Sequence, residues 1–188
     1  MTAEHTDNNG SIFKIALNLT LACIISGAII AVVYFLTADI AKQKQAELKK
    51  LALQSIVEGA DQYTPVQGKP GCYKATRDNE LIAYIVPSES KGYGGSIKLL
   101  VAVGPDLKVL RYTILESKET PGLGDKAAKP PFMDQFAGKT SAQLEVTKDA
   151  TNKENIQAIS GATITSRAVT LAVKKAVDEV SSMTKGGE

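Results

Sequence analysis

The sequence predicts an α+β protein in which one N-terminal transmembrane helix precedes a single domain of antiparallel sheet and helices. Three observations support this prediction. An uncharged run lies near the N-terminus, short apolar runs separated by turn residues fill the middle, and an amphipathic pattern of helical period ends the chain. The 188 residues leave room for about one ordinary domain beside the membrane segment.

The uncharged run is long enough to cross a membrane. No charged residue occurs between Lys14 and Asp39, and a hydrocarbon core needs about 20 apolar residues in helical form. The apolar core of a signal peptide is shorter, about 7–15 residues. We therefore expect a polar tail at residues 1–11 and a retained transmembrane helix at residues 12–38. A buried core helix and a cleaved signal peptide are the alternatives.

A connecting helix is expected at residues 39–60, continuing out of the membrane. Its apolar positions share one helical face. They are Leu48, Leu51, Ala52 and Ile56. Gly59 is a plausible helix end. Lysines follow the span more densely than they precede it, which by the positive-inside rule places the following domain in the cytoplasm, although long domains are exported despite such charges.

The predicted domain, residues 61–188, begins with a loop and continues as strands. Two prolines and two glycines within residues 65–71 indicate the loop. Apolar runs at residues 81–86, 96–103 and 107–115 predict three strands. Gly104-Pro105-Asp106 is a strong turn signal between the last two strands, which should form a hairpin. Three glycines before that hairpin leave room for close approach of the backbone. They are Gly92, Gly94 and Gly95.

The rest of the domain reads as a glycine-rich loop followed by helices. The loop covers residues 119–126, Pro130-Pro131 and residues 132–136 predict a turn and a short helical piece, and a short strand is expected at residues 144–146. Apolar residues recur at three- and four-residue spacing after Ser166, which predicts a final amphipathic helix. Thr165 or Ser166 is its expected N-cap.

Composition argues against several classes of function. The net charge is +2, and no tract combines clustered basic residues with aromatic ones, so nucleic acid is not an expected partner. His5 is the only histidine and no CxxC is present, which leaves no basis for a Ser-His-Asp triad, a zinc site or an iron–sulfur cluster. A chain this poor in catalytic side chains needs a cofactor if it is to carry out chemistry.

One motif is suited to binding a phosphate. Ser160-Gly161-Ala162-Thr163 stands immediately before the final helix, where unpaired N–H groups and the positive end of the helix dipole attract anions. Gly161 and Ala162 keep bulk away from this point, and Thr163 supplies a hydroxyl. Ordinary helix capping would explain the same composition.

The motif resembles the flavin-attachment motif of the FMN-binding domain family. That family includes the G subunit of the Rnf electron-transport complex and the C subunit of the sodium-translocating NADH:quinone reductase. Residues 92–101 resemble the family's glycine turn and strand, and residues 119–125 resemble its flavin-pocket loop. The three segments follow one another in the family's order behind a membrane anchor, and their residues favour the Rnf protein. Gln157 stands where the family often has an acidic residue.

The resemblance implies a cofactor, FMN, joined through its phosphate to the hydroxyl of Thr163. The implied cofactor-binding residues are Thr163, Ser160, Gly161, Ala162, Glu119, Thr120, Leu123, Gly124 and Tyr93. Ser160, Gly161 and Ala162 would shape the phosphate site. Glu119 and Thr120 would offer polar contacts to the isoalloxazine ring, while Leu123 and Gly124 would pack against it and Tyr93 would stack on it.

Other interpretations of single residues stay open. Glu119 would otherwise be a solvated loop carboxylate, and Tyr93 a turn residue packed on the sheet. Lys126 would either balance the phosphate charge or be an ordinary surface lysine.

The function implied by the resemblance is electron transfer within an ion-translocating ferredoxin:NAD oxidoreductase complex. The implied partners are the other membrane and redox subunits, membrane lipid and a flavin transferase that attaches the cofactor. The implied location is the bacterial cytoplasmic membrane, with the FMN domain on the exported side. The alternatives are a component of the quinone-reductase type and a membrane-tethered scaffold module without cofactor.

Overall fold

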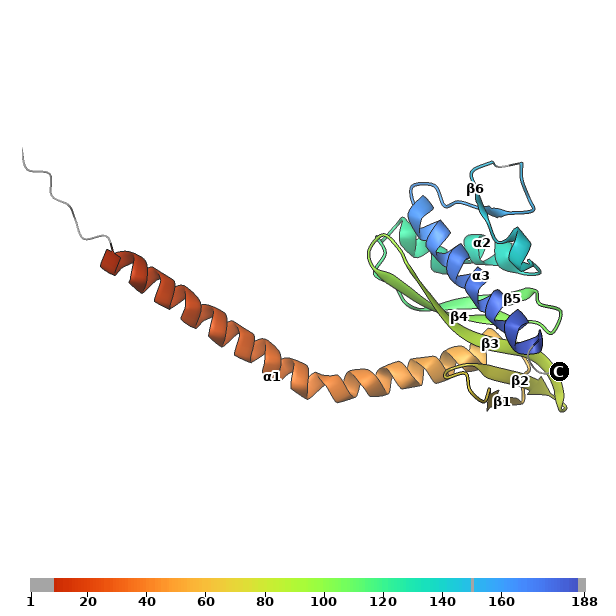
Figure 1. The fold of residues 1–188 in the computed structure, drawn as a ribbon, viewed down its shortest axis with the longest axis horizontal. Helices are drawn as coiled ribbons and strands as arrows, with labels where there is room; N and C mark the ends of the chain where they lie inside the picture. Colours follow the sequence, from red (N-terminus) through yellow and green to blue (C-terminus); the bar gives the residue numbers. More distant parts are fainter. Residues whose placement is uncertain (1–8, 150, 186–188) are drawn as a thin grey trace, which may run out of the picture. The chain divides into compact units, whose positions relative to one another are not determined.

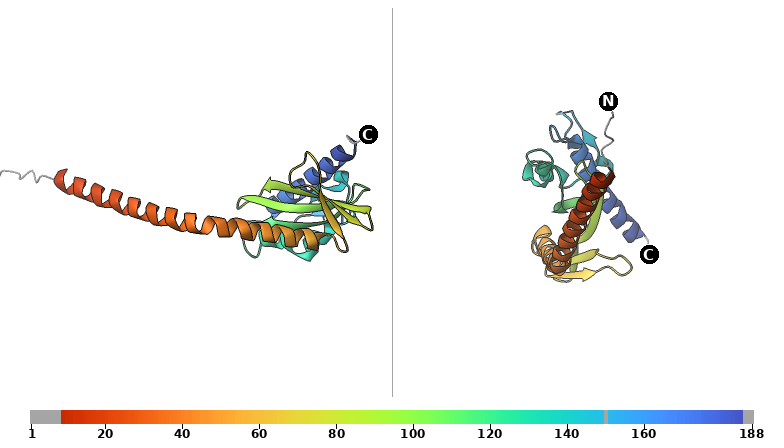
Figure 2. Two further views of the ribbon diagram at one scale, coloured as in Figure 1. Left: turned by 90° about the horizontal axis from the view of Figure 1, so that it is seen from below. Right: turned by 90° about the vertical axis from the view of Figure 1, so that its left-hand side faces the viewer.

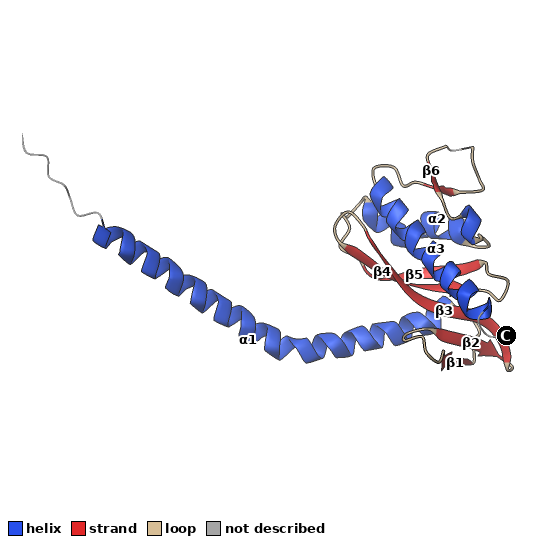
Figure 3. Cartoon of the chain, in the orientation of Figure 1, coloured by secondary structure: helices blue, strands red, loops and turns tan. Residues whose placement is uncertain are grey.

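The computed structural model describes residues 9–149 and 151–185, which divide into two units, Met1–Glu47 and Leu48–Glu188. Figures 1 and 3 show the elements along the chain. Helix α1 runs from Asn9 to Ile56. Its segment Ile12–Ala38 has the length and composition of a membrane span, with a mean hydropathy of 2.5 and none of its side chains buried. The hydroxyls of Thr20 and Thr37 donate to carbonyls one turn earlier, which satisfies these polar groups inside the apolar segment.

The second unit is built on a five-stranded antiparallel sheet in which every strand pairs with its neighbour in sequence (Figures 1 and 2). The strands are β1 Gln62–Pro65, β2 Tyr73–Arg77, β3 Glu80–Lys91, β4 Ser96–Val103 and β5 Val109–Glu116. Between β5 and the last helix lie η1 Gly124–Ala128, α2 Pro130–Met133, η2 Asp134–Phe136, η3 Ser141–Gln143 and the parallel pair β6 Val146–Thr147 and β7 Ile156–Gln157. Helix α3, Thr163–Lys185, ends the described chain.

Both faces of the sheet are covered, as the side chains of β4 show. Its alternate residues Ile97, Leu99, Val101 and Val103 pack with α3, whereas Leu100 and Ala102 pack with the last turns of α1. Because successive side chains of a strand point to opposite faces, a strand buried on both sides reads as an almost continuous apolar run. The end of α1 is therefore part of the domain core.

The predicted fold class is confirmed, and several elements lie where the sequence places them. β4 has the predicted bounds, β3 contains residues 81–86, and β5 overlaps residues 107–115. The N–H of Leu107 donates to the carbonyl of Gly104 over 3.0 Å and so closes the predicted hairpin turn. α2 and η2 confirm the helical piece over residues 132–136, and α2 already begins at Pro130, where the sequence indicates a turn.

Two strands fall outside the prediction. Pro65, which the sequence places in a loop, ends β1, and β2 follows that loop. β1 lies at the sheet edge with three of its four residues exposed, so it lacks the alternating apolar pattern that marks a strand, and an edge strand tolerates proline. In β2 only Ala75 is fully buried. β6 meets the strand expected at residues 144–146 only at Val146.

One helix prediction holds in part and another is wrong. Of the predicted apolar face of α1, Ile56 is buried and Ala52 is partly buried, whereas Leu48 and Leu51 are more than half exposed; Leu53, which is outside the predicted set, is buried. The last helix begins at Thr163, so that Thr165 and Ser166, the expected caps, lie inside its first turn. Their hydroxyls are bound elsewhere: Thr165 bonds to Glu119, and Ser166 donates to the carbonyl of Ala162 and accepts from the N–H of Ile159.

Candidate functional site

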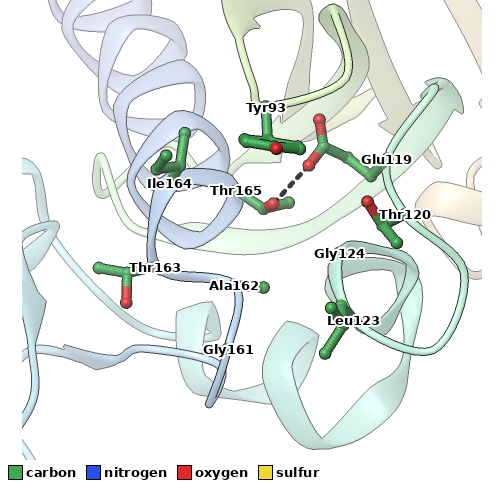
Figure 4. A pocket seen from close by; sticks show the side chains of 10 residues that line it. All are labelled: Tyr93, Glu119, Thr120, Leu123, Gly124, Gly161, Ala162, Thr163, Ile164 and Thr165. Carbon is green, nitrogen blue, oxygen red and sulfur yellow. Dashed lines mark hydrogen bonds between the residues drawn. The ribbon is translucent and has the colours of Figure 1, made fainter.

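A cavity of about 610 Å³ lies between the start of α3 and the loop that follows β5 (Figure 4). Its lining residues are Tyr93, Glu119, Thr120, Leu123, Gly124, Gly161, Ala162, Thr163, Ile164 and Thr165. We call it the main pocket. The structure brings together eight of the nine predicted site residues in this pocket. Ile164 and Thr165 are additional lining residues from the first turn of α3.

Three large apolar side chains of the main pocket are open to solvent. Tyr93 is 73 % exposed, Ile164 56 % and Leu123 42 %. The exposure of Tyr93 rules out the alternative in which it packs on the sheet. Single exposed apolar residues are ordinary, but their gathering around one concave site is typical of a ligand-binding surface.

Gly161 and Gly124 let the helix start and the loop approach each other. A Cβ at Gly161 would stand 3.1 Å from Leu123 Cδ2, and the residue has a φ of +78°, which favours glycine. A Cβ at Gly124 would stand 2.6 Å from Glu119 Cβ. Both predicted glycines therefore have a packing reason for their identity, and the pocket has its shape because of them.

Glu119 joins two other segments to its own loop. Its Oε1 accepts a hydrogen bond of 2.9 Å from the N–H of Gly94, in the turn between β3 and β4. Its Oε2 accepts one of 2.5 Å from the hydroxyl of Thr165 in the first turn of α3; Figure 4 shows this second bond. The alternative of a solvated loop carboxylate is therefore wrong, and contact of Glu119 with an isoalloxazine ring stays a prediction.

The two threonines at the start of α3 have different surroundings. Thr165 is 2 % exposed and its hydroxyl is bonded to Glu119. Thr163 is half-buried, and within the described part of the chain its hydroxyl has no hydrogen-bond partner. Residues two positions apart in an α-helix differ by about 200° in direction around the helix axis. In Figure 4 the side chain of Thr163 accordingly points away from Glu119, while that of Thr165 points toward it.

A second, smaller cavity of about 320 Å³ adjoins the main pocket at Gly161 and Thr163. It also contains Ser160, the ninth predicted residue, and Lys148, which is absent from the predicted set. Lys148 follows β6, and the β6–β7 pairing brings this segment near the motif. No local pattern around Lys148 marks it in the sequence. Lys126 lines neither of these two cavities; it lines a third cavity, which Gln157 also lines. The side chain of Lys126 is exposed, which fits the alternative of an ordinary surface lysine.

Comparison with known proteins agrees with this fold class. The model of the FMN-binding domain family matches residues 92–178, a range that includes every residue lining the main pocket. The second unit is thus an FMN-binding domain. The model of the RnfG N-terminal region matches residues 1–54.

Relatives with matches along the full chain identify the family. The chain is 50 % identical over 184 residues to the G subunit of the proton-translocating ferredoxin:NAD(+) oxidoreductase complex of Clostridium ljungdahlii, a match that covers 98 % of this chain and 99 % of that protein. It is 28 % identical over 195 residues to the G subunit of the Na(+)-translocating complex of Acetobacterium woodii, covering 93 % and 94 %. The chain therefore belongs to the RnfG family, the G subunits of the Rnf complexes, which confirms the predicted resemblance.

Among solved structures, the crystal structure of the C subunit of the Na(+)-translocating NADH-quinone reductase from Parabacteroides distasonis is 26 % identical, with a TM-score of 0.48, and the match covers 56 % of this chain and 58 % of that one.

Proposed function

We propose that this chain is a membrane-anchored electron-transfer subunit of a ferredoxin:NAD oxidoreductase complex, carrying FMN in the main pocket through a phosphodiester to Thr163. The names of the relatives support the complex, and the matched domain family supports the cofactor. The sequence has no nicotinamide-binding fingerprint, so oxidation or reduction of NAD belongs to partner subunits.

The observation that carries the proposal is the state of the Thr163 hydroxyl. It lies where the main pocket meets the smaller cavity, half-buried and without a hydrogen-bond partner among the described residues. The neighbouring Thr165 hydroxyl is buried and bonded. A hydroxyl that is to be esterified must be accessible and must not be held in a hydrogen bond within the protein. The Thr163 hydroxyl meets both conditions among the described residues.

The residues present fit FMN. A cavity of about 610 Å³ is within the usual range for a small-molecule site, roughly 300–1,000 Å³. The exposed apolar groups of Tyr93, Leu123 and Ile164 suit a flat aromatic ring. The smaller cavity is lined by Lys148 and by Thr163 at the start of α3, and a basic side chain and a helix N-terminus both attract a phosphate.

The bound flavin would supply the redox chemistry. The chain's own residues would hold it in place: Thr163 as the tether, Lys148 as counter-charge to the phosphate, and Leu123 as cover for the ring. A tether fixes the distance to the neighbouring redox centres and prevents loss by diffusion. The span has no Asp, Glu, Lys, Arg or His between Lys14 and Asp39, so the ion path is placed in other subunits.

In-gel fluorescence of the denatured full-length chain tests the tether. With an active flavin transferase co-expressed, we expect yellow-green fluorescence that survives denaturation, and we expect Thr163→Ala to abolish it. Thr184→Ala, which removes a threonine hydroxyl near the other end of α3, is the matched control and should keep it. Mass spectrometry should find the adduct on the tryptic peptide 154–167. Fluorescence that persists in Thr163→Ala, or is absent from the unmodified sequence, would contradict the proposal.

The proposed location is the bacterial cytoplasmic membrane, with residues 12–38 as a single span, residues 39–60 as the connecting segment and the FMN-binding domain, residues 61–188, on the exported side. Resemblance to flavinylated domains supports this side, whereas the lysines after the span favour the other. Protease added to spheroplasts distinguishes the two, because an exported domain is digested and a cytoplasmic one is protected until lysis. Co-purifying subunits distinguish the Rnf complex from a quinone reductase.

A further inference from the structure

The carboxylate of Glu119 holds together three segments that are far apart in sequence. These are its own loop, the turn between β3 and β4, and the first turn of α3. The bond to Gly94 spans 25 residues and the bond to Thr165 spans 46. The three segments supply most of the lining of the main pocket. Each carboxylate oxygen is therefore used to join one wall of the pocket to another.

The surroundings of Glu119 are shaped to its carboxyl group. A Cβ at Gly92 would stand 2.4 Å from Glu119 Oε1, and a Cβ at Gly124 would stand 2.9 Å from Oε2. Both approaches are closer than side-chain carbons achieve. A Cβ at Gly94 would meet the carbonyl oxygen of Lys118 at 2.0 Å. Glycine at all three positions is thus explained by the presence of the Glu119 side chain or of the backbone beside it.

We propose that Glu119 is a positioning residue for flavin attachment, which it serves by fixing the first turn of α3 through Thr165. Thr163 belongs to the same helical turn, so a bond that holds Thr165 also sets where the Thr163 hydroxyl stands relative to the pocket. The role rests on the proposed attachment at Thr163. The link between the segments is a property of the protein alone and can be measured without flavin.

Replacing Glu119 by glutamine separates two roles of the carboxylate, that of a hydrogen-bonding link and that of a negative charge. Glu119→Gln keeps an oxygen that accepts from the Gly94 N–H and gains an amide that donates to the Thr165 hydroxyl, so both links survive while the charge is lost. Glu119→Ala removes both links. Positioning therefore predicts that glutamine rescues what alanine destroys. A role of the negative charge itself, as a base or as an electrostatic partner of the flavin, predicts that glutamine fails as alanine does.

The first measurement is amide hydrogen exchange on the full chain without flavin. For Glu119→Ala we expect exchange about tenfold or more faster in the turn at residues 92–95 and at the start of α3, because two hydrogen bonds to a charged acceptor are lost. Glu119→Gln should stay within about twofold of the unmodified chain, as a neutral hydrogen bond retains much of the effect. Glu154→Ala, an exposed glutamate on the segment before the motif, is the control. Unchanged exchange in Glu119→Ala would overturn the proposal.

The second measurement is the yield of covalent flavin under limiting transferase. We expect a loss of about tenfold in Glu119→Ala and in Thr165→Val, with Glu119→Gln and Thr165→Ser close to the unmodified chain. The double variant Glu119→Ala/Thr165→Val should lose little more than either single one, since both remove the same link. Equal loss in Glu119→Gln and Glu119→Ala, or additive losses, would overturn positioning. Absence of flavin from every variant and the unmodified chain would instead count against attachment at Thr163, and hydrogen exchange would still decide the link.

Discussion

Thr163 and Thr165 show how the same residue type is given two roles within one helical turn. Their side chains differ by about 200° around the helix axis, so only Thr165 reaches Glu119. The Thr165 hydroxyl links α3 to the loop, whereas under the proposed function the Thr163 hydroxyl is the one that is esterified. At the residue scale, the two threonines are distinguished by whether the hydroxyl has a hydrogen-bond partner among the described residues. The sequence of the motif alone does not show which threonine has one.

Gly94 should not tolerate a side chain. Alanine would bring a Cβ to 2.0 Å from the Lys118 carbonyl oxygen, which is backbone and cannot turn aside. We expect Gly94→Ala to lower the free energy of unfolding by about 1–3 kcal/mol, the usual cost of overpacking, as measured by urea denaturation in detergent.

The control for this prediction is Gly138→Ala. Gly138 has a φ of +75° but open space around its Cβ direction, so only the backbone strain remains, about 1–2 kcal/mol. A loss in Gly94→Ala that is smaller than the loss in Gly138→Ala would show that the turn at residues 92–95 can move away from Lys118.

At the scale of elements, β5 is tied to η1 by a buried tyrosine. Tyr112 is fully buried and its hydroxyl donates to the carbonyl of Ala127, also fully buried. In addition its ring packs edge-on against Phe136 of η2. Because η1 begins at Gly124, which lines the main pocket, this contact helps to hold the pocket loop in place.

Removal of this hydroxyl should have an effect at neutral pH and another in alkali. Tyr112→Phe leaves the Ala127 carbonyl unpaired and should cost about 1–3 kcal/mol at pH 7. Burial, and less strongly the Asp134 carboxylate, raises the pKa of Tyr112. The folded chain therefore keeps this proton where the unfolded chain, with a tyrosine pKa of about 10, loses it. The contribution is complete below pH 10 and is lost as pH rises above it, by about 1.4 kcal/mol per pH unit.

The measurement is the urea midpoint between pH 8 and pH 11. The loss of stability above pH 10 should be steeper in the unmodified chain than in Tyr112→Phe, which has no proton to lose at this position. Tyr63, whose pKa burial also raises, is present in both chains and does not affect the difference. Parallel curves would mean that Tyr112 ionises without unfolding.

The elements that could be predicted are those whose packing leaves a local pattern. β4 is buried on both faces and reads as an apolar run, and the hairpin after it carries Gly104-Pro105-Asp106. β1 leaves no such pattern because it is an exposed edge strand that ends in Pro65. The sequence pattern places the start of α3 too late, since the first turn carries hydroxyls that resemble caps but are bonded to Glu119 and to the preceding loop.

The site divides in the same way. The motif around Thr163 and the loop with Glu119 could be recognised, because each is a continuous segment. Lys148 could not, since only the pairing of β6 with β7 brings it near the motif. The link between Glu119 and Thr165 was also out of reach, because it depends on the side-chain directions of two distant segments.

At the scale of the whole molecule, the end of α1 belongs to the domain that follows it. Leu53, Ile56 and Val57 are buried against one face of the sheet together with Ala83, Leu100 and Ala102. A chain that begins at Leu48 keeps this contact, whereas one that begins at Gly59 exposes that face of the sheet to water.

We expect the chain beginning at Leu48 to fold without the membrane segment. The chain beginning at Gly59 should be less stable by several kcal/mol, since burial of each such side chain contributes about 1.5–3 kcal/mol. Urea denaturation followed by circular dichroism compares the two. Equal midpoints would show that the last turns of α1 contribute nothing to the domain.

The link made by Glu119 has a consequence for the order of events in the cell. Both of its hydrogen bonds join parts of the polypeptide itself, so the link among the three segments requires no cofactor to form. Under the proposed function, folding and loading are then separate in time. A cell short of flavin would accumulate finished but unloaded subunits. When flavin returned, the supply of working subunits would rise at the pace of the transferase, with no new synthesis of the chain.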